Sequence, residues 1–268
     1  MSQGGVSDRG VSGRVIVVTG ANSGIGLAMT RALLALGDRV GALDVQEDAL
    51  AELTADGAEL RRYRCDVTDS QQVTEAVGDV LDAWGRIDVL VNNACIALFK
   101  PYVERTQEEI RREFEVNYFG YLNGTDAVLP AMCNQGEGVI HNVSSGVGIT
   151  GYPGIAGYAS TKGAIEALTR TLDLELKPYG IRVNLMHPPL TRTCSSAPLG
   201  VPSQMMADPE DVGRKLARKV GQTASVLTPD LSTRLGIAAN RHFPVRMGRF
   251  LARMARRAEE RGLADDGP

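Results

Sequence analysis

The chain has 268 residues, a formal net charge of -3 and a hydrophobic fraction of 43%. Such a length and composition are typical of a globular protein with a large core, and they exclude global disorder. The slight acidity argues against nucleic acid as a partner, and no apolar stretch approaches the roughly 18 residues that a membrane span requires. Residues 1–12 lack the apolar region of a secretory signal, so we expect a flexible tail and a cytoplasmic protein.

Short apolar runs, which predict buried strands, alternate with amphipathic stretches, which predict helices. In chain order we predict the strand Arg14–Thr19, the helix Ile25–Leu36, the strand Arg39–Asp44, the helix Glu47–Asp56, the strand Leu60–Cys65, the helix Ser70–Trp84, the strand Ile87–Val91, one long helix from Gln107 to about Asn134, the strand Gly138–Val143, the helix Tyr158–Tyr179, the strand Ile181–Met186, the helix Pro209–Gly221 and the strand Ser225–Thr228. Strands that alternate with helices in this way indicate βαβ units. The predicted fold class is therefore α/β, a single-domain doubly wound parallel sheet (a Rossmann fold) with a helical C-terminal extension.

The C-terminal part of the chain departs from this alternation. Pro and Ser residues are frequent from Pro188 to Ser203, which predicts a mobile loop. We place the catalytic Rossmann domain at residues 13–240 and a basic amphipathic extension at residues 241–268. Within it, Arg241–Gly262 contains seven arginines and two glutamates, a net charge of +5. We expect this segment to pack on its own domain; the alternative is a peripheral membrane contact or closure over an acidic or acyl substrate.

The first strand runs directly into the sequence TGANSGIG, which precedes a helix. Glycines at such a turn permit a tight bend, close approach of a pyrophosphate and close helix packing, and the helix N-terminus offers free N–H groups. A tight connection without a ligand is the alternative, but the position in the first βαβ unit favours dinucleotide binding. The predicted cofactor-binding residues of this turn are Gly20, Asn22, Ser23, Gly24, Ile25 and Gly26.

Asp44 ends the second predicted strand, 18 residues after Gly26. A carboxylate at this point accepts hydrogen bonds from an adenosine ribose diol and repels a 2′-phosphate. No basic residue follows directly, because Val45 and Gln46 come next, and Ser23 occupies a turn position that could have offered a cation. We therefore predict that the cofactor is NAD; the alternative role for Asp44 is a helix cap.

A metal site and a disulfide framework are not expected. The four cysteines, at positions 65, 95, 133 and 194, form no CxxC pair, and the three histidines are equally scattered.

Tyr158 and Lys162 lie four residues apart on a predicted helix, so both side chains share one face. A phenol with a pKa of about 10 is a poor base near neutrality, and a neighbouring cation lowers that pKa. Ser144 and Ser145 end a strand, and Ser145 lies 13 residues before Tyr158.

These motifs occur with Asn92-Asn93-Ala94 after the fourth strand and with Asn117 in the long helix. Together with TGANSGIG, they resemble the short-chain dehydrogenase/reductase family over residues 13–195. The resemblance implies a catalytic tetrad of Asn117, Ser145, Tyr158 and Lys162. The spacing of 13 residues to Tyr158 in the family selects Ser145, which leaves Ser144 a structural role. In it Tyr158 would be the general acid/base, Ser145 would stabilise the substrate oxygen, Lys162 would hold the nicotinamide ribose and Asn117 would position a relay water.

The resemblance also implies further cofactor contacts. Asp66 and Val67 would contact the adenine, although a helix cap is an equal alternative for Asp66, and Asn93 would contact ribose through its backbone while Asn92 braces the sheet. Cys95 and Pro189 stand where the family has glycine, so we expect the loop around the nicotinamide to differ from the family pattern. The remaining predicted cofactor contacts are Ala94, Pro188, Thr191 and Thr193.

The tetrad predicts an oxidoreductase that transfers hydride between NAD(H) and a secondary alcohol or ketone. Small and apolar residues in the predicted specificity loops favour a hydrophobic small-molecule substrate. The alternatives are a redox-neutral epimerase or lyase that works by transient oxidation, and a non-catalytic NAD-sensing protein. We expect a homodimer or homotetramer.

Overall fold

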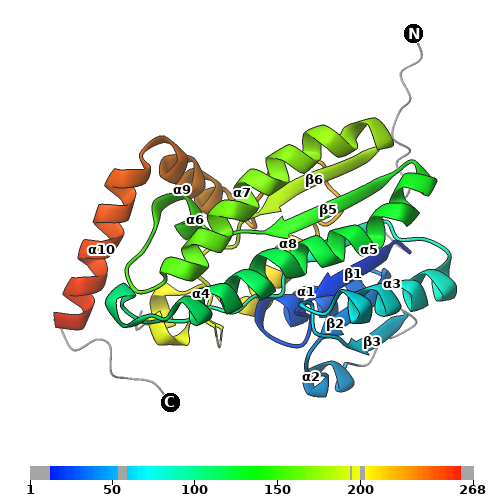
Figure 1. Cartoon of the computed structure of the whole chain (residues 1–268), viewed down its shortest axis with the longest axis horizontal. Helices are drawn as coiled ribbons and strands as arrows, with labels where there is room; N and C mark the ends of the chain where they lie inside the picture. Colours follow the sequence, from blue (N-terminus) through cyan, green and yellow to red (C-terminus); the bar gives the residue numbers. More distant parts are fainter. Residues whose placement is uncertain (1–12, 54–58, 194, 200–202, 261–268) are drawn as a thin grey trace, which may run out of the picture.

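The computed structural model describes residues 13–53, 59–193, 195–199 and 203–260. Within these ranges seven parallel strands form one sheet in the order β3-β2-β1-β4-β5-β6-β7 (Figure 1). The strands are β1 (Val15–Thr19), β2 (Arg39–Asp44), β3 (Leu60–Arg64), β4 (Val89–Asn92), β5 (Gly138–Val143), β6 (Ile181–Met186) and β7 (Val226–Leu227). The strand order reverses between β1 and β4, so the predicted doubly wound α/β fold is confirmed.

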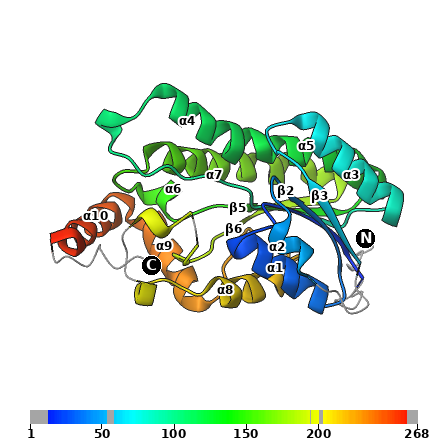
Figure 2. The same ribbon diagram turned by 90° about the horizontal axis from the view of Figure 1, so that it is seen from below.

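Helices cover both faces of the sheet, with α1 and α8 on one side and α3, α5 and α7 on the other (Figure 2). The last helix, α10, lies at one end of the molecule, beyond α6 and α9 (Figure 1). The bounds are α1 (Gly24–Ala35), α2 (Asp48–Ala51), α3 (Ser70–Trp84), α4 (Gln107–Phe114), α5 (Gly120–Gln135), α6 (Val147–Thr150), α7 (Ala156–Leu176), α8 (Pro209–Ala217), α9 (Leu231–His242) and α10 (Pro244–Glu260). In the described part of the chain, no helix is long and apolar enough to cross a lipid bilayer.

The central strand β1 is an almost continuous apolar run because both faces of the sheet are buried there, whereas the edge strand β3 carries three arginines and is largely exposed. In β1, Ile16 and Val18 belong to the apolar cluster shared with α1 and α8, whereas Val15 and Val17 belong to the cluster shared with α3 and α5. The alternation of side chains along one strand thus supplies both halves of the core.

The predicted long helix from Gln107 to Asn134 is interrupted. After α4 the chain makes a π-helical turn at Glu115–Phe119 before α5 begins at Gly120. A π turn inserts one extra residue per turn, and such turns are frequent at functional sites. Asn117 lies in this turn.

The C-terminal part differs most from expectation. The sequence pattern does not predict α9, and the domain boundary expected at residue 240 falls inside this helix. Asp230 caps α9, because its side chain accepts a hydrogen bond from the Thr233 N–H. The expected tail at residues 1–12 lies outside the described residues, as does part of the loop expected to be mobile through Ser203.

His141 is a buried histidine that holds the sheet to a loop. On β5, its Nδ1 lies 2.5 Å from the Asn184 Oδ1 on β6, and its Nε2 accepts a hydrogen bond from the Gly221 N–H. Burial lowers the pKa of His141 to about 4, with a contribution from the charge of Arg14 and opposition from Asn184. The imidazole is therefore neutral in the folded protein.

This histidine makes the fold sensitive to acid. Between pH 6.5 and 4 the unfolded chain binds a proton that the folded chain excludes, so the free energy of unfolding falls as the pH falls, by about 3 kcal/mol in all. Urea unfolding across this range should show that loss. In His141→Gln the slope should flatten, whereas His242→Gln, at an exposed position, should retain it.

Candidate active site

A cavity of about 710 Å³ opens at the carboxyl ends of the strands, where the strand order reverses. It receives residues from the turn after β1, the ends of β2, β3, β4 and β5, the start of α7 and the segment after β6. Most of the predicted site residues line it. They are Gly20, Ser23, Gly24, Ile25, Gly26, Asp44, Asp66, Val67, Asn93, Ala94, Ser145, Tyr158, Lys162, Pro188, Thr191 and Thr193. Asn22 and Asn117 do not line it.

At Gly20 and Gly26 the turn after β1 has no room for a side chain. A Cβ atom on Gly20 would lie 2.7 Å from the Ala94 Cα, and one on Gly26 would lie 2.0 Å from the Gly20 carbonyl oxygen. Gly20 and Gly24 have positive φ angles of 65° and 52°, which glycine adopts without strain. The backbone after β1 therefore packs directly on the backbone after β4 and leaves the N-terminus of α1 facing the cavity.

Asn22 supports this turn from outside the cavity. Its Oδ1 accepts a hydrogen bond from the Leu50 N–H, and its Nδ2 donates to the Asp48 carboxylate at 2.7 Å. Its own N–H donates to Asp44. The predicted direct contact of Asn22 with a cofactor remains a prediction.

One end of the cavity is acidic. Asp44 lies there with Val45 and Gln46, and Asp66 and Val67 line the same end. The Asp66 carboxylate also accepts hydrogen bonds from the Thr68 N–H and hydroxyl, so it shapes its own turn. The basic residues of the cavity, Arg112 and Lys162, come from α4 and α7 rather than from these strands.

The two asparagines after β4 have different surroundings. Asn93 lines the cavity, and its Nδ2 donates to the carbonyl oxygens of Thr19 and Gly20. Asn92 is fully buried, and its Nδ2 donates to the Tyr121 carbonyl and to the Asn142 Oδ1. The predicted bracing role of Asn92 is thus confirmed, and Asn93 ties β4 to the glycine turn.

The Tyr158, Ser145 and Lys162 side chains meet at the other end of the cavity. Ser145 lies close enough to the Tyr158 phenol to lower its pKa, and the Lys162 Nζ lies 5.6 Å from the centre of the Tyr158 ring. Ser144 turns away, and its hydroxyl donates to the Lys162 carbonyl at 3.5 Å. The structure therefore brings together the three side chains that the family resemblance selects.

The ionisation of this group is governed by burial. Burial, the neighbouring Cys95 and the Glu113 carboxylate raise the pKa of Tyr158 above its ordinary value, whereas the hydrogen bond with Ser145 opposes them. Burial also lowers the pKa of Lys162. Without a further positive charge the phenol stays protonated near neutrality, so the predicted lowering of its pKa needs the full charge of Lys162 and of a bound nicotinamide.

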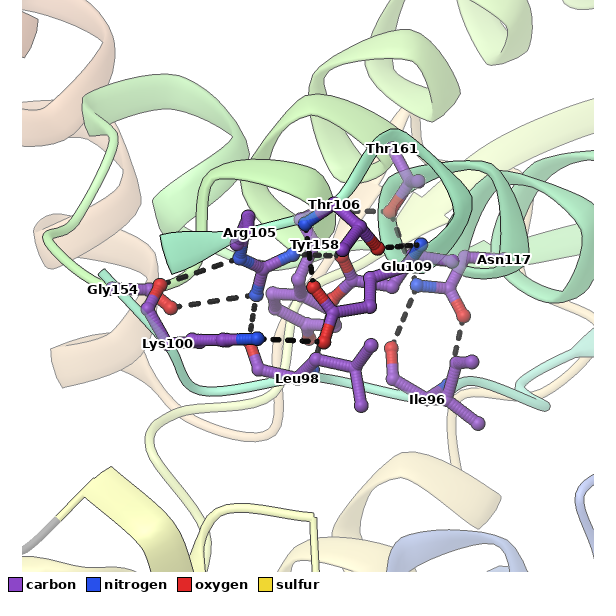
Figure 3. Close-up of polar contacts among 11 residues, drawn as sticks. Ile96, Leu98, Lys100, Arg105, Thr106, Glu109, Asn117, Gly154, Tyr158 and Thr161 are labelled. Carbon is purple, nitrogen blue, oxygen red and sulfur yellow. Dashed lines mark hydrogen bonds and ion pairs between the residues drawn. The ribbon is translucent and has the colours of Figure 1, made fainter. Parts of the chain in front are cut away.

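Asn117 lies behind the cavity rather than in it. In the π turn, its Oδ1 accepts a hydrogen bond from the Ile96 N–H, and its Nδ2 donates to the Ile96 carbonyl and to the Thr161 hydroxyl (Figure 3). Asn117 therefore fixes the segment after Cys95 against the first turns of α7. Its predicted role in positioning a relay water remains a prediction.

A buried ion pair that the sequence pattern did not predict supports the same segment. Arg105 and Glu113 are 2.6 Å apart, with side chains 1% and 0% exposed. The guanidinium also donates to the carbonyls of Leu98, Lys100 and Gly154, as Figure 3 shows in part. This pair holds two loops at the substrate end of the cavity. In the sequence, Arg105 and Glu113 are visible only as two opposite charges eight residues apart, one before and one within a predicted amphipathic helix.

The C-terminal helices close the cavity on the substrate side. Thr233, Gly236, Ile237 and Asn240 from α9 line it, and so does Leu251 from α10. The predicted packing of the basic segment on its own domain agrees with this placement. The sequence pattern did not predict these wall residues, because it did not predict α9.

Glu166 anchors α9. On α7, one turn after Lys162, its carboxylate lies 2.7 Å from the His187 Nε2 and 3.1 Å from the Arg241 guanidinium. Burial raises the pKa of Glu166, but His187, Arg241 and Ser144 together bring it below its ordinary value. The carboxylate is therefore charged, and it links the end of β6 to the end of α9.

The segment after β6, which contains Pro189, borders the cavity. Pro188, Pro189, Thr191 and Thr193 all line the cavity. Thr193 approaches the glycine turn, since a Cβ atom on Gly24 would lie 3.0 Å from its Cγ2. Cys95, the other departure from the family pattern, lines the cavity as well.

A dinucleotide fits these residues. The glycine turn leaves the N–H groups of a helix N-terminus facing an open cavity, and the acidic end at Asp44 offers acceptors for hydroxyl groups. Over the described residues, His, Cys, Asp and Glu side chains form no cluster of three or more that could hold a metal ion.

Comparisons with known proteins agree with this arrangement. A sequence model of the family described as short chain dehydrogenase matches residues 14–201. The chain is 37% identical over 197 residues to cyclopentanol dehydrogenase from Comamonas sp. strain NCIMB 9872, which covers 70% of this chain and 79% of that protein. It is 36% identical over 209 residues to carbonyl reductase (NADPH) 2 from Sus scrofa, with 78% and 81% covered.

A solved structure is also similar. The 3-ketoacyl-(acyl-carrier-protein) reductase from Brucella melitensis, complexed with NADH, has a TM-score of 0.72 and 28% identity, covering 82% of this chain and 96% of that chain. The chain therefore belongs to the short-chain dehydrogenase family. It is an oxidoreductase of that family, and its cofactor is a nicotinamide dinucleotide.

Proposed function

We propose that this enzyme transfers hydride between NAD(H) and a secondary alcohol or ketone that has an apolar body. The observation that carries the proposal is the meeting of Tyr158, Ser145 and Lys162 in one cavity with the glycine turn. The test is a panel of apolar secondary alcohols, including cyclopentanol, supplied with NAD or NADP. Reduced cofactor should accumulate with NAD. A redox-neutral enzyme would consume substrate without accumulating reduced cofactor. A non-catalytic sensor would bind the dinucleotide but would not consume substrate.

In the proposed reaction, Tyr158 carries the proton. Its phenolate takes the proton of the substrate hydroxyl in oxidation, and its phenol returns one to the carbonyl oxygen in reduction. Ser145 hydrogen-bonds the same substrate oxygen and stabilises the charge that develops there. Lys162 binds the nicotinamide ribose and favours the phenolate electrostatically. When bound, the nicotinamide supplies or accepts the hydride.

The substrate end of the cavity favours an apolar body. Most of the side chains there are aliphatic or aromatic. They come from the segment after β4, the π turn, α6 and the loop that follows it, the segment after β6 and the C-terminal helices. They are Ile96, Phe99, Val116, Val147, Ile155, Leu199, Ile237 and Leu251. The cyclic alcohol in the name of the Comamonas relative is of this kind.

Tyr158→Phe should abolish turnover but leave dinucleotide binding and folding intact, because it removes the oxygen that carries the proton. We expect kcat to fall about 10²–10⁴-fold, measured by the absorbance of reduced nicotinamide, with dinucleotide affinity followed by fluorescence. Tyr179→Phe, at an exposed position, is the matched control and should behave as the parent. Near-parental kcat in Tyr158→Phe would overturn the assignment.

Asp44→Ala should relax the preference for NAD, because it removes a charge that repels a 2′-phosphate. We expect the ratio of kcat/KM for NAD to that for NADP to fall about tenfold or more. Asp44→Asn removes the charge but keeps one of the two oxygens that accept from the Asn22 and Gln46 N–H groups, so it should disturb the turn less than Asp44→Ala and still relax the preference. A parent enzyme that prefers NADP would contradict our interpretation of Asp44.

Leu251→Ala should weaken substrate binding without affecting the dinucleotide, because Leu251 lies on the substrate side of the cavity. Burial of a leucine side chain is worth about 1.5–3 kcal/mol, so KM for an apolar alcohol should rise about tenfold. Leu235→Ala on α9 is the matched control, since Leu235 is 63% exposed and does not line the cavity. Equal KM values in both variants would place the substrate elsewhere.

A further inference from the structure

Lys162 keeps its ammonium group inside the protein. The side chain is 1% exposed, and its Nζ donates hydrogen bonds to the Val143 carbonyl at 2.8 Å and to the Tyr121 hydroxyl at 3.0 Å. The Nζ also lies 4.9 Å from the centre of the Tyr121 ring. A buried ammonium is costly unless its N–H groups find acceptors. Here a backbone carbonyl and a phenol provide them.

Tyr121 is built into the back of the site. It is 1% exposed, it comes from the first turn of α5, and it does not line the cavity. Its hydroxyl donates to the same Val143 carbonyl at 3.1 Å, so three polar atoms form a closed triangle. Burial raises the pKa of Tyr121 well above its ordinary value. The phenol therefore stays neutral, accepts from the ammonium and donates to the carbonyl.

We propose that Tyr121 is a positioning residue of this active site: its phenol holds the Lys162 ammonium in place and stabilises the charge that Tyr158 needs in order to release its proton. The catalytic half of this inference rests on the proposed function, because it assumes that Tyr158 carries the proton. The structural half, that Tyr121 stabilises the charged form of Lys162, does not.

The sign of the effect follows from the contacts. Without the Tyr121 hydroxyl, a buried ammonium loses an acceptor, and the pKa of Lys162 falls below its already lowered value. A weaker or displaced cation then favours the Tyr158 phenolate less, so ionisation of Tyr158 moves to higher pH. The other titratable groups that act on Tyr158 and Lys162 are Cys95, after β4, and Glu113, on α4. Both are still present when the Tyr121 hydroxyl is removed.

The test is Tyr121→Phe, which keeps the ring and removes only the hydroxyl. The chain has five lysines, so NMR of protein labelled with ¹³C at the lysine Cε can follow each ammonium without substrate or cofactor. The Lys162 signal is identified by its absence from Lys162→Arg. We expect the pKa of Lys162 to be lower by about 1 or more in Tyr121→Phe than in the parent. An unchanged pKa would overturn the proposal.

The second measurement is the pH profile of kcat/KM for alcohol oxidation. Its acidic limb should move to higher pH in Tyr121→Phe, and oxidation at any pH below that limb should slow about tenfold if the limb moves by one pH unit. A lowered Lys162 pKa with an unmoved profile would overturn the catalytic half. If the parent oxidises no alcohol, the proposed function fails while the NMR titration still decides the role of Tyr121.

Tyr118→Phe is the matched control. Tyr118 is three residues away, half-buried, and its hydroxyl forms no hydrogen bond to any other described residue. Tyr118→Phe should leave both the Lys162 pKa and the pH profile of kcat/KM unchanged. Equal changes in Tyr118→Phe and Tyr121→Phe would overturn the proposal. If Tyr121→Phe does not fold, Tyr121→Met fills the space with an apolar side chain and should lower the Lys162 pKa in the same direction.

Discussion

The active site depends on keeping one ammonium group in a dry interior. Over the described residues no carboxylate forms an ion pair with Lys162, so its charge is compensated by the Val143 carbonyl and the Tyr121 phenol. These groups come from the end of β5 and the start of α5, and Lys162 itself comes from α7. The three elements must therefore meet at one point. Ser145, two residues after Val143, and Tyr158, one turn before Lys162, are placed by the same meeting.

The parts of the fold that were predictable depend on local rules. Strands buried on both faces are mostly apolar, as β1 is. The turn after β1 needs glycine because backbone atoms occupy the space that side chains would take at Gly20 and Gly26. The tetrad residues were found because the motifs that contain them resemble those of the short-chain dehydrogenase/reductase family. The residues that support them, such as Tyr121 and Glu113, look like ordinary members of amphipathic helices. Their partners are distant in the sequence, so no local pattern marks them.

Helix α9, in the C-terminal part, could not be predicted from the sequence for a different reason. Leu231 and Leu235 of α9 are 67% and 63% exposed, while Ile237 is buried, so the apolar residues do not follow the buried face. The Asp230 cap was the available signal. The π turn around Asn117 was equally invisible, because one inserted residue leaves the apolar pattern on both sides almost unchanged. Helix α9 and the π turn both lie at the site, where tertiary contacts rather than local sequence preferences determine the structure.

The two ends of the cavity are held by different means. At the dinucleotide end backbone packs on backbone, and any side chain at Gly20 or Gly26 would collide with main-chain atoms. At the substrate end the walls are side chains on elements held by ion pairs, Arg105 with Glu113 and Arg241 with Glu166. Substitutions in those walls can reshape the cavity while the Lys162 contacts with β5 and α5 remain. The residues that hold the Lys162 ammonium are therefore different from those that hold the walls, and Glu113 is the wall residue that also acts on the pKa of Tyr158.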